Sequence, residues 1–212
     1  MKRRTLLLAP LAVAGGLAVG WAALPVRQRL VGAEPLPPEP GRHAFNGWVR
    51  IGDDGLVHLV CPKTEMGQGV HTGLAMLLAE ELGVALDRVR IAPAPVDAIY
   101  GNGTTVVDAL PFLPDDHSLL RRVTEHLVAK IMREGAPLLT GGSSSLKDLW
   151  LPLRLAGAAA RQMLQAEAAA RWDVAEAEVA VADGALRHAA SGRTLGFGDV
   201  AAAAAARPLP DE

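Results

Sequence analysis

The chain has 212 residues, half of them apolar, and a formal net charge of −2. This length allows one sizeable domain or two small ones with a buried core. A near-neutral charge gives no basic footprint, which argues against nucleic-acid binding. The single cysteine, Cys61, excludes an internal disulfide and an iron–sulfur cluster held by this chain alone, because such a cluster needs about four thiolates. We expect Cys61 to be a buried structural thiol.

The N-terminal stretch joins basic residues to an apolar run. Arg3 and Arg4 precede Leu6–Leu24, which contains no charged residue. Such a run is long enough to cross a bilayer or to direct export, and the arginine pair is typical of a twin-arginine signal. We therefore predict an N-terminal apolar signal or anchor helix and a periplasmic or periplasm-facing inner-membrane location. An ordinary signal anchor is the alternative. Val31-Gly32-Ala33 approximates a signal-peptidase site, and an uncleaved anchor stays open.

The next stretch predicts a linker followed by strands. Glu34–Pro40 is rich in proline and is expected to be an extended linker without packing partners. Phe45–Ile51 and Gly55–Cys61 form two β-like runs around an Asp-Gly turn, which predicts a hairpin. Asp87–Pro93 alternates apolar and charged residues and is expected to pair with these strands.

Between the predicted hairpin and a predicted helix at Val70–Leu82 lies a glycine-rich turn. Gly67 and Gly69 allow a sharp turn that brings bare backbone N–H groups close to a ligand, and the following helix points its positive end at the same place. Gln68 adds an amide that both donates and accepts hydrogen bonds. The pattern favours an anionic ligand. A tight turn with a solvent-facing glutamine is the alternative.

Residues 94–117 are irregular in pattern, and a loop of this length usually is functional or covers something. Ser118–Glu134 has the spacing of an amphipathic helix. We expect its leucines, valines and isoleucine to face the core. Arg121, Arg122 and Lys130 are expected to form its solvated face.

A second glycine-rich turn, Thr140-Gly141-Gly142-Ser143-Ser144-Ser145, precedes an alanine-rich helix predicted to reach about Trp172. Ser145 and Asp148 have the spacing of a capping box, and Pro152 should kink the helix or mark its first turn. Small residues and hydroxyl groups at a helix N-terminus suit a phosphate or carbonyl group. Plain helix capping is the alternative. Farther on, Glu178–Val181 and two turns predict a small hairpin, and Ala201–Ala206 predicts a final helix.

The two turns together predict one extended anionic ligand held at two points. Neither turn is a nucleotide fingerprint, because Thr72 stands where a dinucleotide motif has glycine, and no Gly-Lys-Ser/Thr sequence occurs. The six histidines lack the spacing of a metal site.

Thr64-Glu65-Met66-Gly67-Gln68-Gly69-Val70, followed by Leu74–Leu82, resembles the molybdopterin-binding subunit of the xanthine dehydrogenase superfamily of molybdenum hydroxylases. Within that superfamily, the likeness is strongest to the beta subunits of the isoquinoline 1-oxidoreductase type. The second turn and Leu153–Arg161 carry the same resemblance. Together the two matches cover about residues 45–207. The resemblance implies an α+β fold, with β-hairpins packed against helices and glycine-rich cofactor loops at helix N-termini.

The resemblance also implies a site and partners. Cofactor contacts would come from Gly67, Gln68 and Gly69 of the first loop and from Gly142, Ser143 and Ser144 of the second. The cofactor would be a molybdenum pyranopterin in its molybdopterin cytosine dinucleotide form. Members of the family oxidise N-heterocycles or aldehydes with oxygen from water, use a glutamate as general base, and pass electrons to a separate [2Fe-2S] subunit. A cytochrome c acceptor and a second chain that carries the catalytic half are further partners to consider.

The sequence departs from the family in length. Family chains are several times longer, and their catalytic glutamate has no counterpart here. Gly196-Phe197-Gly198 has the letters of a further cofactor loop but lies in what looks like a terminal turn.

We therefore divide the chain into a twin-arginine-like signal or anchor (1–33), a proline-rich linker (34–44) and a partial molybdopterin-binding domain (45–212). It is expected to be the N-terminal, cofactor-binding part of an exported molybdenum hydroxylase. The alternative is a membrane-anchored α+β remnant or binding module without cofactor or enzymatic activity.

Overall fold

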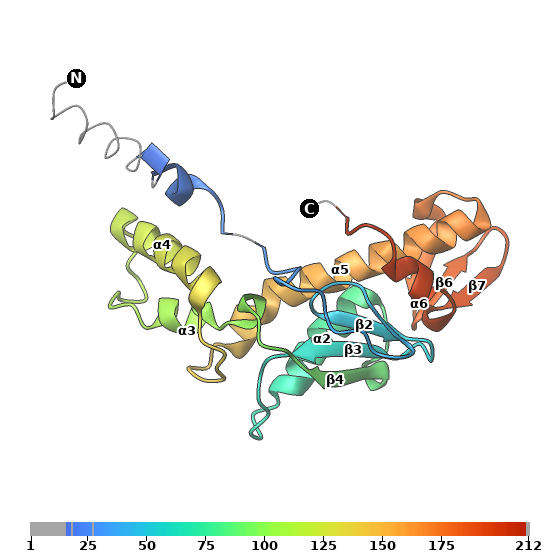
Figure 1. Ribbon diagram of the computed structural model, residues 1–212, viewed down its shortest axis with the longest axis horizontal. Coiled ribbons are helices and arrows are strands. Elements are labelled where there is room, and N and C mark those ends of the chain that lie inside the picture. Colours follow the sequence, from blue (N-terminus) through green and yellow to red (C-terminus); the bar gives the residue numbers. More distant parts are fainter. Residues whose placement is uncertain (1–15, 18, 27, 211–212) are drawn as a thin grey trace.

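The computed structural model describes residues 16–17, 19–26 and 28–210. These residues form an α+β structure organised along one long helix, α5 (Ser145–Trp172), which runs through the molecule (Figure 1). A first sheet and helix α2 (Val70–Leu82) pack beside the middle of α5, whereas a second sheet and helix α6 (Phe197–Ala205) lie toward its C-terminal end. The first turn of α5 is near α3 (Gly103–Asp108) and α4 (Leu119–Gly135).

The first sheet has four strands in chain order: β1 (Arg42–Ala44), β2 (Val49–Gly52), β3 (Val57–Cys61) and β4 (Val89–Pro93). Strands β1, β2 and β3 pair antiparallel, and β4 runs parallel to β3. The predicted hairpin and its pairing with the Asp87–Pro93 stretch are confirmed. Helix α2 and the short η1 (Leu86–Arg88) connect the two parallel strands. The first glycine-rich loop therefore lies at the carboxyl end of β3, where ligand sites of parallel strands commonly lie.

Helices α2 and α5 share the main core. Leu74, Leu78 and Leu82 of α2 are fully buried, as are Leu153 and Leu164 of α5. Gly157 lets the two helices approach closely, since a Cβ added there would lie 2.8 Å from the Cβ of Glu81. Burial of leucines on both helices contributes about 1.5–3 kcal/mol for each side chain.

The C-terminal part contains one strand more than the predicted hairpin. Strands β5 (Val179–Ala182), β6 (Ala185–His188) and β7 (Arg193–Gly196) form an antiparallel sheet after η3 (Glu176–Glu178). Phe197, which we expected in a terminal turn, is instead the first residue of α6 and is buried. Helix α6 packs on α5 through Val200, Ala201 and Ala204.

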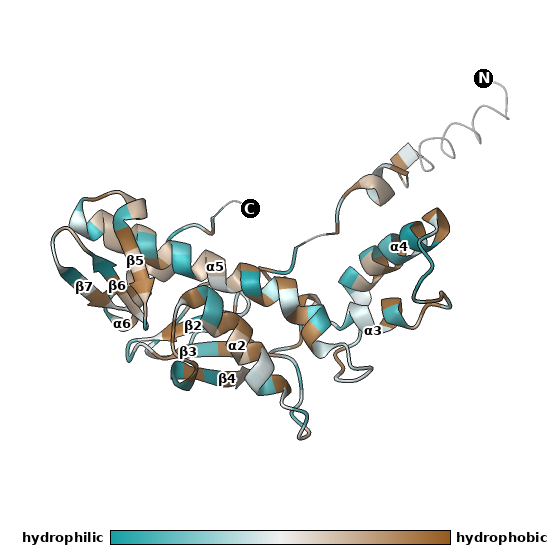
Figure 2. Cartoon of the chain, turned by 180° about the vertical axis from the view of Figure 1, so that it is seen from behind, coloured by the Kyte–Doolittle hydropathy of each residue, from teal (hydrophilic) through white to brown (hydrophobic). Residues whose placement is uncertain are grey.

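Helix α4 forms close to the predicted range, and Arg122 is exposed as predicted, but other residues of both predicted faces lie differently. Leu119 and Leu120 are 67% and 69% exposed, whereas Lys130, predicted to be solvated, is buried. The reason is that Lys130 donates hydrogen bonds to the carbonyl oxygens of Trp21 and Leu24, so the polar face of α4 holds the N-terminal segment. Brown apolar positions appear on α4 in Figure 2, where the helix stands apart from both sheets.

Residues 94–117 also contain two short helices, η2 (Ala98–Tyr100) and α3, rather than irregular chain throughout. The side chain of Asn102 begins α3 by accepting a hydrogen bond from the backbone N–H of Thr105. Tyr100 packs edge-on against Trp48, with ring centroids 5.0 Å apart. This segment is therefore part of the packed structure and leads into the site.

The predicted N-terminal anchor helix is wrong for the part of the chain that the structure describes. Residues 16–17 and 19–23 are helical, but no helix among the described residues is long and apolar enough to cross a membrane. Arg3, Arg4 and the start of the Leu6–Leu24 run lie outside the described residues.

The proline-rich stretch also differs from the expected linker without packing partners. Leu36 packs against the core, and the backbone oxygen of Pro37 accepts a hydrogen bond from Arg50 at 2.7 Å. Glu39 forms an ion pair with Arg50, whose side chain is almost fully buried. These contacts tie residues 36–39 to the first sheet.

Candidate functional site

The two glycine-rich loops lie side by side. The backbone N–H of Thr64 donates a hydrogen bond of 2.8 Å to Oγ1 of Thr140, which joins the first loop to the second. Both loops line one cavity of about 360 Å³, together with the first turns of α2 and α5. Its lining residues are Met66, Gln68, Gly69, Val70, Thr140, Gly141, Ser143, Ser145 and Leu146. Three of the predicted site residues, Gln68, Gly69 and Ser143, are thus brought together.

The first loop does not present the bare N–H groups expected from its sequence. One carboxylate oxygen of Glu65 accepts hydrogen bonds from the backbone N–H groups of Gly67 and Gly69, each at 2.9 Å. The other accepts one from the N–H of His71 at 3.0 Å. These bonds, above all the one from His71, lower the pKa of Glu65 below its ordinary value of 4.5. An anion can therefore use these three N–H groups only by displacing Glu65.

Gln68 is exposed at the mouth of the cavity but is folded back on its own loop. Its Oε1 accepts a hydrogen bond from the N–H of Met66 at 2.5 Å, and its Nε2 donates one to the carbonyl of Thr64 at 2.8 Å. Each end of the amide keeps one further hydrogen-bonding position. Gly67 and Gly69 have positive φ angles, and a Cβ added at either would meet no atom within 4 Å. The outer side of this loop is open.

Ser144, a predicted site residue, faces inward. Its Oγ contacts Thr105 Oγ1 at 2.7 Å, receives a hydrogen bond from Nδ2 of the buried Asn102 at 2.9 Å, and donates one to the carbonyl of Gly141 at 2.9 Å. Ser144 therefore holds the second loop in shape. Gly142 has a positive φ angle and lies against Thr105. Neither Gly142 nor Ser144 lines the cavity.

The predicted capping box at Ser145 and Asp148 is wrong. The cap of α5 is Ser144, which makes no side-chain cap bond, and Asp148 is turned into the protein. Among the described residues, none accepts a hydrogen bond from the backbone N–H groups of Ser145, Leu146 or Lys147. The first turn of a helix with open donors favours a negative group. Two of these three residues, Ser145 and Leu146, line the cavity.

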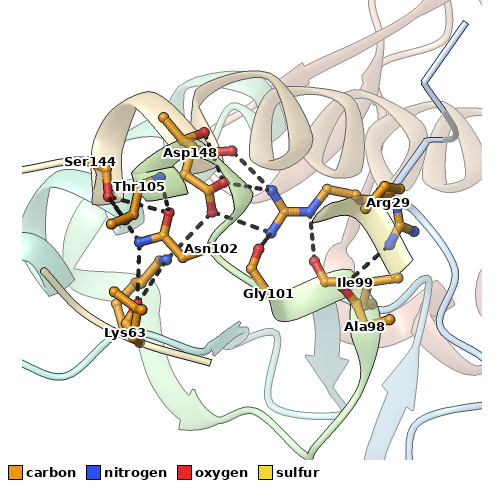
Figure 3. Close-up of polar contacts among 12 residues, drawn as sticks. Arg29, Lys63, Ala98, Ile99, Gly101, Asn102, Thr105, Ser144 and Asp148 are labelled. Atoms are coloured by element: carbon orange, nitrogen blue, oxygen red, sulfur yellow. Dashed lines mark hydrogen bonds and ion pairs between the residues drawn. The ribbon is translucent and has the colours of Figure 1, made fainter. Parts of the chain in front are cut away.

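A buried charged cluster lies behind the loops (Figure 3). Asp148 accepts hydrogen bonds from Arg29 at 3.1 Å and from Thr104 at 3.0 Å. Lys63, the residue before the first loop, places its Nζ 3.4 Å from the Asp148 carboxylate and 3.4 Å from the carbonyl of Leu139. Burial lowers the pKa of Lys63, and Asp148 opposes that effect. Asp148 thus links the start of the first loop to the helix that follows the second.

Sequence reasoning gave no role in the site to Arg29, Lys63 or Asn102, and it gave Asp148 only the role of a helix cap. The available signal was Pro152, four residues after Asp148, since a proline inside a helix leaves the carbonyl of the residue four positions earlier without its usual donor. A polar contact at Asp148 could have been anticipated from this, but its partner could not.

Cys61 is buried, as expected, and burial raises the pKa of its thiol. In the described ranges, no group of three or more histidine, cysteine, aspartate or glutamate side chains is arranged to hold a metal ion.

The residues around the cavity have the chemistry to bind an anionic group with polar edges. Open N–H donors of Ser145 and Leu146, the open side of Gly69, and the remaining hydrogen-bonding positions of Gln68 all border the same cavity. Hydrogen-bond donors at a helix N-terminus match a phosphate group, and an amide matches the edge of a heterocycle.

Comparison with known proteins supports this assignment. Residues 12–106 match the molybdopterin cofactor-binding domain family. The chain belongs to the molybdopterin-binding domains of the xanthine dehydrogenase family. It is 32% identical over 158 residues to the beta subunit of isoquinoline 1-oxidoreductase from Brevundimonas diminuta, covering 74% of this chain and 16% of that protein.

Two further similarities of this molybdopterin-binding domain are weaker. One subunit of the nicotinate dehydrogenase of Pseudomonas putida is 24% identical over 153 residues, covering 72% of this chain and 10% of that protein. The crystal structure of quinoline 2-oxidoreductase from Pseudomonas putida 86 superposes with a TM-score of 0.46 and 18% identity, covering 76% of this chain and 16% of that one. The molybdopterin-binding domain thus spans less than a fifth of the length of the relatives it matches.

Proposed function

We propose that the chain is the cofactor-binding N-terminal part of a molybdenum hydroxylase large subunit that oxidises N-heterocycles or aldehydes. The observation that carries the proposal is the shared cavity, which both glycine-rich loops line together with Ser145 and Leu146, two residues whose N–H groups are open. Two relatives are named for N-heterocyclic substrates, isoquinoline and nicotinate, which supports that class first.

In this proposal the cofactor is the cytosine dinucleotide form of molybdopterin. Its anionic phosphates suit the first turn of α5, and Gln68 with Ser143 offers hydrogen bonds to its polar edges. The bound molybdenum supplies a centre that accepts electrons from the substrate. The described residues of this chain hold and orient the cofactor. The catalytic glutamate and the remaining cofactor contacts belong to the part of the relatives' length that this chain does not span, on the same polypeptide or on a second chain.

The partners in this proposal are a small [2Fe-2S] subunit, which receives the electrons, and a cytochrome c acceptor beyond it. A single cysteine cannot ligate a cluster, so the iron–sulfur centres of this proposal lie outside the 212 residues of this chain. The proposed compartment is the periplasm. The support is the sequence Arg3-Arg4 ahead of an uncharged run, a pattern typical of proteins exported after they have folded around a cofactor.

Metal and pterin analysis of the protein from its native host tests the proposal. We expect about one molybdenum and one pterin for each chain, recovered with an iron–sulfur polypeptide. A Gln68→Ala variant should retain less molybdenum, while Gln165→Ala, which lies away from the cavity, should retain as much as the wild type. Absence of molybdenum and pterin from the native protein would contradict the proposal and favour a domain that keeps the fold without the chemistry.

A further inference from the structure

Residues 19–26 and 28–33 form an N-terminal strap across the α4 end of the molecule. Nζ of Lys130 donates a hydrogen bond of 2.7 Å to the carbonyl oxygen of Leu24. Nε2 of His126 lies 2.9 Å from the carbonyl oxygen of Ala22. Arg133 donates to the carbonyl of Gln28 at 3.0 Å. These three basic side chains all come from α4, so a single helix binds successive carbonyl groups of the strap.

The second half of the strap enters the core. Nε1 of the fully buried Trp48 donates to the carbonyl of Arg29 at 2.5 Å, and the N–H of Gly47 donates to that of Leu30 at 2.8 Å. Leu30 itself packs against the core. The backbone N–H of Ala33 donates to the carboxylate of Asp97 at 2.8 Å. The strap therefore has the contacts of a structural element of the domain.

Arg29 is the centre of these contacts (Figure 3). Its Nε donates to the carbonyl of Ile99 at 2.6 Å and its Nη2 to the carbonyl of Gly101 at 2.9 Å. Its Nη1 donates to the Asp148 carboxylate at 3.1 Å, and the side chain is only 13% exposed. A planar guanidinium has its donors in a fixed fork, so the three acceptors fix its orientation.

Pro152 explains why Arg29 and Asp148 meet at this point of α5. Proline has no backbone N–H, so the carbonyl oxygen of Asp148, four residues earlier, lacks its usual helical donor. Nη1 of Arg29 donates to that oxygen at 3.2 Å. Arg29 thus contacts both the side chain and the backbone of Asp148, and it supplies the donor that Pro152 cannot give to the backbone oxygen.

We infer that Arg29 is a positioning residue for the cofactor site and that the strap carrying it stays attached to the mature protein. Arg29 fixes Asp148, Asp148 contacts Lys63 at the start of the first loop, and the helix turn containing Asp148 follows the second loop. The spacing of the two loops therefore depends on a residue that lies upstream of both. This inference rests on the proposed function for the nature of the ligand.

The attachment of the strap has a direct consequence for processing. Cleavage after Val31-Gly32-Ala33 would remove Arg29, the donor to the carbonyl oxygens of Ile99, Gly101 and Asp148. The Asp148 carboxylate would then keep only Thr104 and Lys63. It would also remove one wall of a cavity of about 410 Å³ that Arg29 and Asp148 line. Any cleavage of the chain must therefore lie upstream of the strap.

Intact-mass measurement of the protein isolated from its host tests the attachment. We expect a mass that includes residues 19–33. A mature protein that begins at residue 34 would overturn the inference that the strap stays attached.

Hydrogen exchange on the full chain, produced without molybdenum, tests the positioning role. Arg29→Met should increase amide exchange in residues 63–71 and 139–147 and leave exchange in the second sheet, residues 179–196, unchanged. Arg29→Lys keeps the charge but cannot reach all three acceptors. If Arg29→Met does not fold, the same increase in amide exchange is expected for Arg29→Lys. Arg42→Met is the matched control, because Arg42 is an exposed arginine paired with Glu39 on the surface.

The double variant Arg29→Met with Asp148→Asn should show no more loop exchange than Asp148→Asn alone, because the two residues act in series. Molybdenum content of the loaded protein should fall in the Arg29 variants and not in Arg42→Met. Unchanged loop exchange in both Arg29 variants would overturn the positioning role. If the wild-type protein contains no molybdenum, the proposed function is contradicted. The exchange experiment then still tests the positioning role of Arg29, because it uses protein produced without molybdenum.

Discussion

Thr64 and Thr140 connect the two glycine-rich loops through a hydrogen bond of 2.8 Å from a backbone N–H to a side-chain oxygen. The two residues are far apart in the sequence, and each begins a loop that lines the same cavity. Thr140→Val keeps the shape of the side chain but removes the acceptor. We expect it to cost about 0.5–1.5 kcal/mol of stability and to lower the molybdenum retained for each chain.

Thr194→Val is the control for this substitution, since Thr194 is exposed on β7 and away from the loops. Metal analysis after extended dialysis measures retention. Equal molybdenum in the Thr140 and Thr194 variants would show that the bond between the loops does not matter for cofactor retention.

Glu65 makes the first loop sensitive to pH. Its pKa is lowered in the folded protein because it accepts bonds from the N–H groups of His71, Gly69 and Gly67. A lowered pKa means that the stabilisation is present above the ordinary value of 4.5 and is lost as the pH falls through the folded value. The difference in thermal midpoint between wild type and Glu65→Gln should therefore be present near neutral pH and shrink in acid.

Glu80→Gln removes an exposed carboxylate from the helix that follows this loop and is the matched control. Thermal unfolding followed at several pH values gives the comparison. A wild-type advantage over Glu65→Gln that grows as the pH falls would contradict the assigned role of the carboxylate.

The exposed apolar face of α4 predicts a solubility effect without a stability effect. Leu120 is 69% exposed, so Leu120→Ala should change the free energy of unfolding by no more than about 0.5 kcal/mol. Leu164→Ala on α5 removes a fully buried side chain and should cost about 2–5 kcal/mol. Urea unfolding measures both. Light scattering should show less self-association for Leu120→Ala than for the wild type, and a large loss of stability in that variant would mean that α4 packs differently.

Gly157 permits the close approach of α5 to α2. A Cβ added there would lie 2.8 Å from the Cβ of Glu81 and 3.2 Å from Cδ1 of Leu78, so Gly157→Ala should cost about 1–3 kcal/mol through overpacking. Gly135, at the end of α4, would meet nothing within 4 Å, so Gly135→Ala should cost little. Denaturant midpoints of the two variants provide the comparison, and equal values would indicate that the helices can separate without loss.

Local patterns predicted most of the secondary structure. The run at Val70–Leu82 is bounded by glycines that adopt left-handed conformations at both ends, and these signals place the helix where the structure has it. The predicted strands around the Asp-Gly turn pair because their apolar residues share a buried face.

Contacts between distant residues could not be predicted in this way. The hydrophobic period of α4 predicts a stripe of apolar residues but not the direction in which this stripe points. Lys130 is buried because it donates hydrogen bonds to carbonyl groups of a segment more than 100 residues earlier. The carboxylate of Glu65 could equally have pointed to solvent. Pro152 marks the Asp148 carbonyl as an acceptor without a helical donor, but no local pattern identifies Arg29 as its partner, because the strap that carries Arg29 is distant in the sequence.

The crystal structure of the molybdenum-loaded protein, with anomalous scattering recorded at the molybdenum absorption edge, tests the central claim most directly. We predict density for the cofactor's phosphate groups beside the N–H groups of Ser145 and Leu146, with Gln68 in hydrogen-bonding contact with the cofactor. Cofactor density elsewhere on the chain, with the cavity between the two loops containing only water, would contradict the account.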